Sequence, residues 1–100
     1  MRVVWTFFAV ERATEAAAYI ARDKPEAALT WLEGLFDSTD DLADFPQLGR
    51  VVPEIGLPEY REIVYRKSHR VVYNVDKSTV SILTVRNFAQ LLDLAELGLD

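Results

Sequence analysis

The chain contains no cysteine and only one histidine among its 100 residues. The absence of cysteine excludes a disulfide framework, a thiolate metal site and a thiol nucleophile. One histidine, together with acidic residues that lack the spacing of a calcium loop, gives no basis for a metal site, so we expect no metal and no cofactor. Any acid–base mechanism that uses an imidazole has to use His69.

The sequence also lacks a long apolar run. No stretch approaches the roughly 20 residues that a membrane-spanning helix needs, and Glu11 and Glu15 interrupt the amino-terminal region where a secretory signal would be uncharged. We therefore expect a soluble, cytoplasmic protein without a membrane partner. Its composition, 50% hydrophobic and 27% charged, is that of an ordinary globular protein, and its length suits one domain over residues 1–100.

Charge is unevenly distributed along this acidic chain, whose net charge is −5. Residues 1–49 hold four basic and nine acidic side chains, whereas residues 50–86 hold seven basic against four acidic. A locally positive region attracts an acidic peptide or a phosphate, but the negative total opposes non-specific binding of nucleic acid.

The first half of the chain has helical periodicity. Thr6 is a candidate cap for a helix over residues 7–22, in which apolar side chains recur every three or four residues. Asp23 and Pro25 then indicate the start of a second helix, with Glu26 completing a capping box and an apolar stripe continuing to residue 43. Two helices joined by so short a turn form an antiparallel hairpin that packs on one face of a sheet.

The second half alternates like a series of strands. Residues 2–5 predict a buried first strand, and residues 50–54, 60–66, 69–75 and 79–86 predict an antiparallel meander. The fold class is therefore α+β, with an amino-terminal helical hairpin on a mainly antiparallel sheet of four to five strands. Residues 88–99 are apolar around most of a helical circumference, which predicts that Phe88, Leu91 and Leu92 contact a partner.

Several short segments, in this order and spacing, resemble the RelE/ParE family of toxins. They are WT at Trp5, YIARDKPEAA at 19–28, FPQLGR at 45–50, VPE at 52–54, YRE at 60–62 and HRVVY at 69–73. The resemblance covers nearly the whole chain. It implies the toxin of a bacterial type II toxin–antitoxin pair, whose partners are a cognate antitoxin, in a hetero-oligomer, and either DNA gyrase in the ParE branch or the ribosome in the RelE branch.

Arginines of the predicted sheet are the candidate site residues. Arg61, Arg70 and Arg86 stand on three consecutive strands, so their guanidinium groups are expected to meet on one face around an anion. In the RNA-cleaving members such a cluster binds the scissile phosphate, and Arg70 matches the family arginine most closely. Arg50 is a further candidate for target or partner binding. The competing interpretation is that these arginines pair with Glu54, Glu59 and Glu62 at the edge of the sheet.

The remaining acid–base candidates are few. Glu54 matches a carboxylate that some ribonuclease members use as a base, although a salt bridge to Arg50 or Arg61 explains it equally well. Strand alternation places His69 on the face opposite Arg70, and Tyr65 and Tyr73 have the spacing of packing residues. Nuclease members place a proton-transferring residue after the last-strand arginine. Here Asn87, Phe88 and Ala89 follow Arg86, and none of them transfers a proton near neutral pH.

Three functions therefore remain open from the sequence. The first, which we favour, is a non-catalytic ParE-like toxin that binds DNA gyrase and is neutralised by its antitoxin. The second is a RelE-like, ribosome-dependent mRNA endoribonuclease that uses Arg61, Arg70 and Arg86 on the phosphate, with Glu54 or His69 as the base. The third is a non-toxic relative that retains only antitoxin binding.

Overall fold

The first helix begins at a side-chain cap that also ties it to the sheet. In the computed structural model, which describes residues 1–99, Thr6 precedes α1 (Phe7–Ala21) and its Oγ1 accepts a hydrogen bond from the Ala9 amide at 3.1 Å. The same hydroxyl donates to the Ile82 carbonyl at 2.8 Å. The predicted cap is thus confirmed, and it fixes the angle at which α1 leaves the sheet.

The second helix differs from the prediction at both ends. α2 (Pro25–Ser38) has Lys24 at its cap position and no side-chain cap, so the capping box at Asp23 is wrong. The reason is that the Asp23 and Lys24 amides still bond to the Ile20 carbonyl and prolong the turn that ends α1. α2 also stops before residue 43, and a 3₁₀ helix, η1 (Asp40–Ala43), follows it.

The predicted antiparallel meander is confirmed, although its first strand, expected over residues 50–54, ends at Val51. β2 (Arg50–Val51), β3 (Tyr60–Tyr65), β4 (His69–Val75) and β5 (Thr79–Asn87) pair antiparallel in succession. β1 (Arg2–Trp5) pairs parallel with β5, which gives the order β1-β5-β4-β3-β2. β1 is therefore an edge strand and only half-buried, not the buried strand that its sequence predicted.

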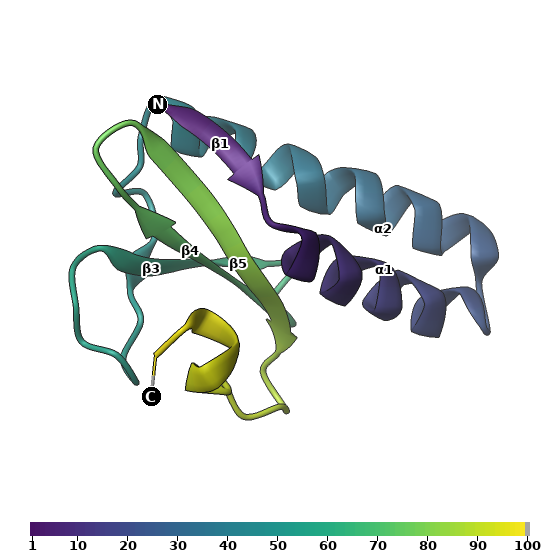
Figure 1. Cartoon of the computed structure of the whole chain (residues 1–100). Coiled ribbons are helices and arrows are strands. Elements are labelled where there is room, and N and C mark those ends of the chain that lie inside the picture. Colours follow the sequence, from purple (N-terminus) through teal and green to yellow (C-terminus); the bar gives the residue numbers. More distant parts are fainter. Residues whose placement is uncertain (100) are drawn as a thin grey trace.

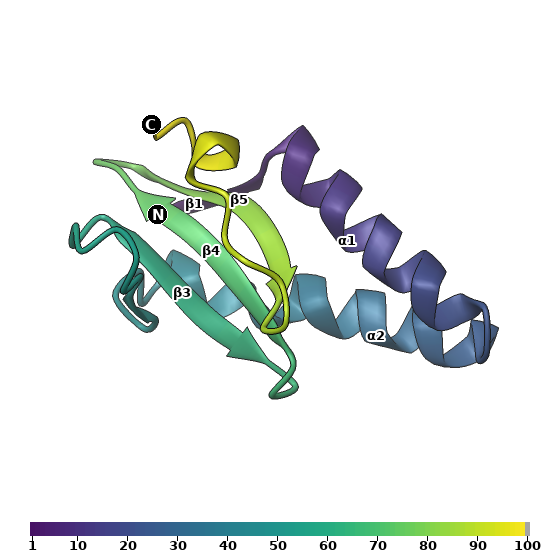
Figure 2. The ribbon, with the colours of Figure 1, turned by 90° about the horizontal axis from the view of Figure 1, so that it is seen from below.

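Both faces of the sheet are covered, by different parts of the chain (Figures 1 and 2). The helical hairpin lies on one face, where the alanines of α1 allow close approach and Leu35, Tyr73 and Ile82 are fully buried. On the opposite face, a smaller cluster around Val52 and Val72 is covered by the carboxy-terminal segment. We call this second surface the tail face.

The carboxy-terminal segment, residues 88–99, contains one short helix. It is a 3₁₀ helix, η2 (Leu94–Leu97), capped by the Asp93 side chain and ended by Gly98 in the left-handed region at φ 77°. Leu92, Leu94, Leu97 and Leu99 pack on the tail face. Most of the apolar run is thus used within the chain, because the sheet has a second apolar face to bury.

Candidate functional site

The tail face carries a chain of four alternating charges. Arg70 donates from Nε and Nη2 to Glu62 Oε1, at 2.8 and 2.6 Å, and from Nη1 and Nη2 to both oxygens of Glu54, at 2.6 and 2.7 Å. Arg50 Nε reaches the other oxygen of Glu62 at 2.7 Å. The order is therefore Glu54–Arg70–Glu62–Arg50. Forked guanidinium–carboxylate bonds of this kind are among the strongest in proteins.

Burial differs sharply among these four charged side chains. The Glu62 side chain is 0% exposed and that of Arg70 8%, whereas Glu54 and Arg50 are 42% and 59% exposed. The inner pair therefore holds charges that have left water, and the outer pair lies at the surface. A buried charge is tolerated only with a partner, so Glu62 needs Arg70 and Arg50, and Arg70 needs Glu62.

The network changes the acid–base properties of its members. Hydrogen bonds from the Arg70 side chain, reinforced by the charges of Arg70 and Arg50, lower the pKa of Glu54 to about 2. Hydrogen bonds to Glu54 and Glu62 raise the pKa of Arg70 above its already high ordinary value. Glu54 is thus a stable carboxylate anion at neutral pH. It is a weak proton acceptor, since general bases work best with a pKa near the operating pH.

The expectation that three arginines share one face is half right. Arg70 and Arg86 are direct cross-strand partners, so both stand on the tail face. Arg61 is opposite Tyr73 on β4 and faces the helices, where its Nη1 donates to the Gly49 carbonyl at 2.9 Å. The placement of Arg61 with the other two is therefore wrong. Side chains alternate along β3, and the buried neighbour of Arg61, Glu62, takes the position facing Arg70.

Arg86 is paired in turn with a residue that the sequence did not single out. Its guanidinium forms an ion pair with Glu96 of η2, and both side chains are largely buried, at 15% and 17% exposed. Two arginines placed side by side would repel each other, but each has its own carboxylate. The chain thus neutralises internally two of the three arginines that the resemblance assigns to a phosphate.

The residues after Arg86 form a turn that is held by side-chain hydrogen bonds. The Asn87 side-chain oxygen accepts from the Ala89 amide at 2.8 Å, and Gln90 Oε1 accepts from the Asn87 amide at 3.2 Å. Phe88 is 46% exposed and Leu91 93% exposed, while Leu92 packs on the tail face. Of the three apolar residues expected to contact a partner, two are therefore accessible.

His69 and the two tyrosines lie on the helix side of the sheet. The His69 ring packs edge-on against Trp31, with ring centroids 5.0 Å apart, and its Nδ1 is 2.7 Å from the Ser68 hydroxyl. Burial lowers the pKa of His69. Tyr65 donates to the Trp31 carbonyl at 2.7 Å and Tyr73 to the Pro46 carbonyl at 2.8 Å. The predictions that His69 lies on the other face of the sheet from Arg70, and that the two tyrosines are packing residues, are confirmed.

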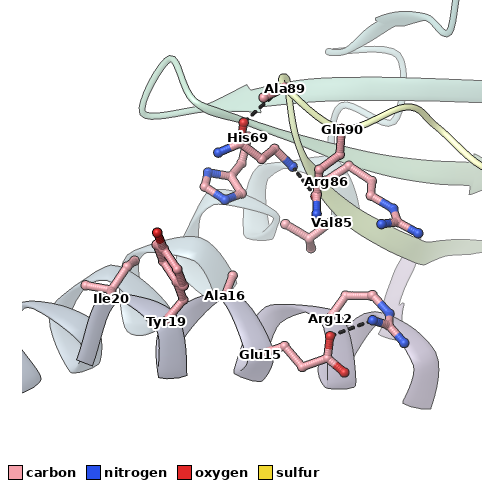
Figure 3. Close-up of a pocket in the computed structure, with 11 residues that line it drawn as sticks. Arg12, Glu15, Ala16, Tyr19, Ile20, His69, Val85, Arg86, Ala89 and Gln90 are labelled. Atoms are coloured by element: carbon pink, nitrogen blue, oxygen red, sulfur yellow. Dashed lines mark hydrogen bonds and ion pairs between the residues drawn. The ribbon is translucent and has the colours of Figure 1, made fainter. Parts of the chain in front are cut away.

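A cleft of about 420 Å³ lies between α1 and the end of β5. In Figure 3 the His69 ring is turned toward Ala16 and Tyr19 of α1, and the Arg12–Glu15 ion pair lies farther along the helix. Arg86 lines this cleft together with His69, whereas Glu54 and Arg70 do not. The structure therefore places the histidine beside the same cleft as Arg86, but away from the Glu54–Arg70 pair.

Across residues 1–99, no group of three or more potential ligands is placed to hold a metal ion, and no helix is long and apolar enough to cross a membrane. The sequence had pointed to three glutamates as arginine partners, and Glu54 and Glu62 do fill this role, although Glu54 pairs with Arg70 and not with Arg50 or Arg61. The third, Glu59, forms no ion pair with any of residues 1–99. Glu96 was missed. Its only local signal is its place in an apolar segment, where a carboxylate that becomes buried needs a cation.

Comparison with known proteins identifies the family. The model of the ParE toxin of type II toxin–antitoxin systems matches residues 3–92. This chain belongs to the ParE toxin family. It is 32% identical to toxin Y4kP of Sinorhizobium fredii over 89% of this chain and 90% of that protein. It is also 31% identical to toxin RelE2 of Caulobacter vibrioides, over 90% of this chain and 98% of that protein.

Solved structures support the same ParE-like fold. A chain of the chromosomal ParDE system from P. aeruginosa matches with a TM-score of 0.75 at 18% identity, covering 87% of this chain and 95% of that one. A YoeB/ParE toxin from Agrobacterium tumefaciens matches with a TM-score of 0.57, also at 18% identity, covering 87% of this chain and 98% of that one. The resemblance to the RelE/ParE toxins is thus confirmed, and with it the expected α+β fold.

Proposed function

We propose that this ParE-family toxin inhibits growth in the cytoplasm by binding DNA gyrase, without catalysing a reaction itself, and that a cognate antitoxin neutralises it by forming a hetero-oligomer. Family membership supports the toxin role and the antitoxin partner. Gyrase is the target that the ParE branch implies. The residues of this chain supply the argument against catalysis.

The observation that carries the proposal is the occupation of Arg70 and Arg86 by carboxylates. A nuclease of this family needs these guanidinium groups free for the phosphate on which charge develops. Here a phosphate would have to displace Glu54 or Glu96, and it would meet their negative charge. Glu54, with its pKa lowered to about 2, is also poorly suited to remove a proton from a ribose hydroxyl.

The candidate site residues divide into two proposed roles. Arg50, Phe88 and Leu91 are exposed and are proposed to contact the antitoxin or the target directly. Arg70 and Leu92 are covered, so they are proposed to hold the surface in shape. Arg61 and Arg86 have internal partners and belong to this second group.

The second candidate is a ribosome-dependent mRNA endoribonuclease. The likeness to the protein named RelE2 favours it. In that reading Arg61, Arg70, Arg86 and Glu54 would form the catalytic set. This requires two changes from the observed arrangement. Glu54 and Glu96 would have to release their arginines, and the Arg61 side chain would have to move to the tail face.

Controlled expression in a bacterium tests the proposal. We expect growth arrest together with induction of a DNA-damage reporter, and relief of both when the antitoxin gene is co-expressed. The control is Arg12→Ser, which removes an arginine of α1 that lies away from the tail face. Its toxicity should equal that of the wild-type protein. Growth arrest with cleaved mRNA and a silent damage reporter would replace the proposal with the second candidate.

A further inference from the structure

The turn between β3 and β4 has a backbone that its residues do not favour. Arg66 and Lys67 have φ values of 49° and 64°, and the Ser68 amide bonds back to the Tyr65 carbonyl at 3.2 Å. Positive φ at both central residues is the requirement of a type I′ turn, for which Asn-Gly is the preferred pair. These are also the only non-glycine residues with positive φ among residues 1–99. Two long basic side chains therefore occupy this turn at a cost in stability.

This turn is the tip of the most basic element of an acidic protein. Residues 63–75 contain no aspartate or glutamate. Within them Arg70 is neutralised by Glu54 and Glu62, whereas Arg66 and Lys67 form no ion pair with any of residues 1–99. The Arg66 guanidinium lies over the Tyr65 ring, 5.2 Å from its centroid. The tip thus offers two exposed positive charges, and that of Arg66 lies on the helix side, over the Tyr65 ring.

Exposed apolar side chains flank the tip. Val64, at the end of β3, is 52% exposed and stands opposite Arg70 on the tail face. Phe88 is 46% exposed, and its amide donates to the Ser68 carbonyl at 3.0 Å, which holds it at the same end of the sheet. Figure 2 shows the β3–β4 turn and the chain leaving β5 at this common end.

Non-glycine residues that are held at positive φ are strained, and such strain is often found at functional sites. From this strain, the unpaired charges and the flanking apolar residues, we propose that the β3–β4 tip is a docking surface for an acidic peptide segment of a protein partner, one that also carries large apolar side chains. Carboxylates of the segment meet Arg66 and Lys67, and its apolar side chains cover Val64 and Phe88.

A nucleic acid fits this surface less well. Phosphodiester recognition relies on many cations, because each neutralised phosphate adds to affinity, and here two cations lie on a chain of net charge −5. Val64 and Phe88 also favour an apolar contact over a sugar–phosphate backbone. The proposal concerns this tip alone and holds whether or not gyrase is the target.

The test uses the full chain and a fluorescent peptide in which leucine and glutamate alternate. Fluorescence anisotropy should show binding that weakens as salt is raised. Lys67→Gly should weaken it about two- to fivefold, as expected for one exposed charge pair, and should raise the melting temperature because glycine accepts positive φ. The double change Arg66→Asn with Lys67→Gly should weaken binding further.

Three comparisons decide the outcome. Lys77→Gly removes a charge from the exposed β4–β5 turn and should leave the peptide affinity unchanged. If it weakens binding as much as Lys67→Gly does, the effect comes from the overall charge of the protein, and the proposal is overturned. A serine–glutamate peptide should bind more weakly than the leucine–glutamate peptide. Absence of peptide binding, or tighter binding of a single-stranded RNA of equal length, would also overturn it.

Discussion

Glu62 and Arg70 form a buried ion pair across the β3–β4 ladder, with 2.6 Å between Oε1 and Nη2. Their side chains share the tail face because Glu62 is opposite Val72 and Arg70 is opposite Val64. Arg70 also reaches out to Glu54 and thereby joins the loop after β2 to the sheet. This pair links the fold to the proposed function, since the arginine that the family resemblance assigns to a phosphate is held by the protein itself.

Removing one member of this pair should be costly. Arg70→Met leaves the fully buried Glu62 carboxylate with Arg50 alone, and we expect a loss of about 3–5 kcal/mol in the free energy of unfolding. Denaturation in urea measures it. Arg12→Met, which breaks the partly exposed Arg12–Glu15 pair, is the matched control and should cost at most about 1 kcal/mol. Equal effects of the two changes would contradict the structural role of the pair.

Glu54 should make stability depend on pH in the acid range. Its folded pKa of about 2 lies below the ordinary value of 4.5, so the unfolded chain takes up a proton first as pH falls. The stabilisation is complete above about pH 5 and is lost as pH falls toward 2. Urea denaturation at a series of pH values should show this slope. Glu54→Gln should flatten it; an unchanged slope would mean that Glu54 is not held by Arg70.

His69 should add a second pH dependence at higher pH. Burial lowers its folded pKa below the ordinary value of 6.5, so protonation favours the unfolded state. Stability is expected to be full above pH 6.5 and to decline as pH falls below it. His69→Phe, which keeps an aromatic ring beside Trp31, should remove the decline. If the variant retains it, another group is responsible.

The carboxy-terminal segment offers a test of packing against exposure. Leu97 is buried and Leu91 is 93% exposed, although both are leucines within one apolar segment. Leu97→Ala should lower the free energy of unfolding by about 2–4 kcal/mol, and Leu91→Ala should change it by less than about 0.5 kcal/mol. Comparable losses would show that Leu91 packs within the chain and is not available to a partner.

Local signals predicted much of the fold. The Thr6 cap and the helical periodicity located α1, and short alternating segments located β3, β4 and β5, because these patterns depend on neighbouring residues. The cap of α2 failed for a local reason as well: the chain prolongs the first turn through Asp23, which shifts the cap to Lys24. Pairing of β1 with β5 joins residues far apart in sequence, and alternation alone does not select it.

The site was less predictable than the fold. Alternation along β3 places Arg61 on the helix side, yet only the register with β4 decides which residue shares a face with Arg70. Glu96 reaches Arg86 because the carboxy-terminal segment folds back over the sheet. The interpretation of residues 88–99 as a partner-binding segment did not include that contact. The local sequence pattern thus did not predict side-chain contacts that form only when the chain folds back on itself.

The most direct test of the central claim compares two purified systems. In the first, the protein is added to DNA gyrase during a supercoiling assay, and we expect inhibition with an accumulation of cleaved DNA, reversed by the antitoxin. In the second it is added to translating ribosomes, and we expect intact mRNA. Ribosome-dependent cleavage of mRNA by the wild-type protein, lost in a folded Arg70→Ala variant, together with unaffected gyrase, would contradict the account.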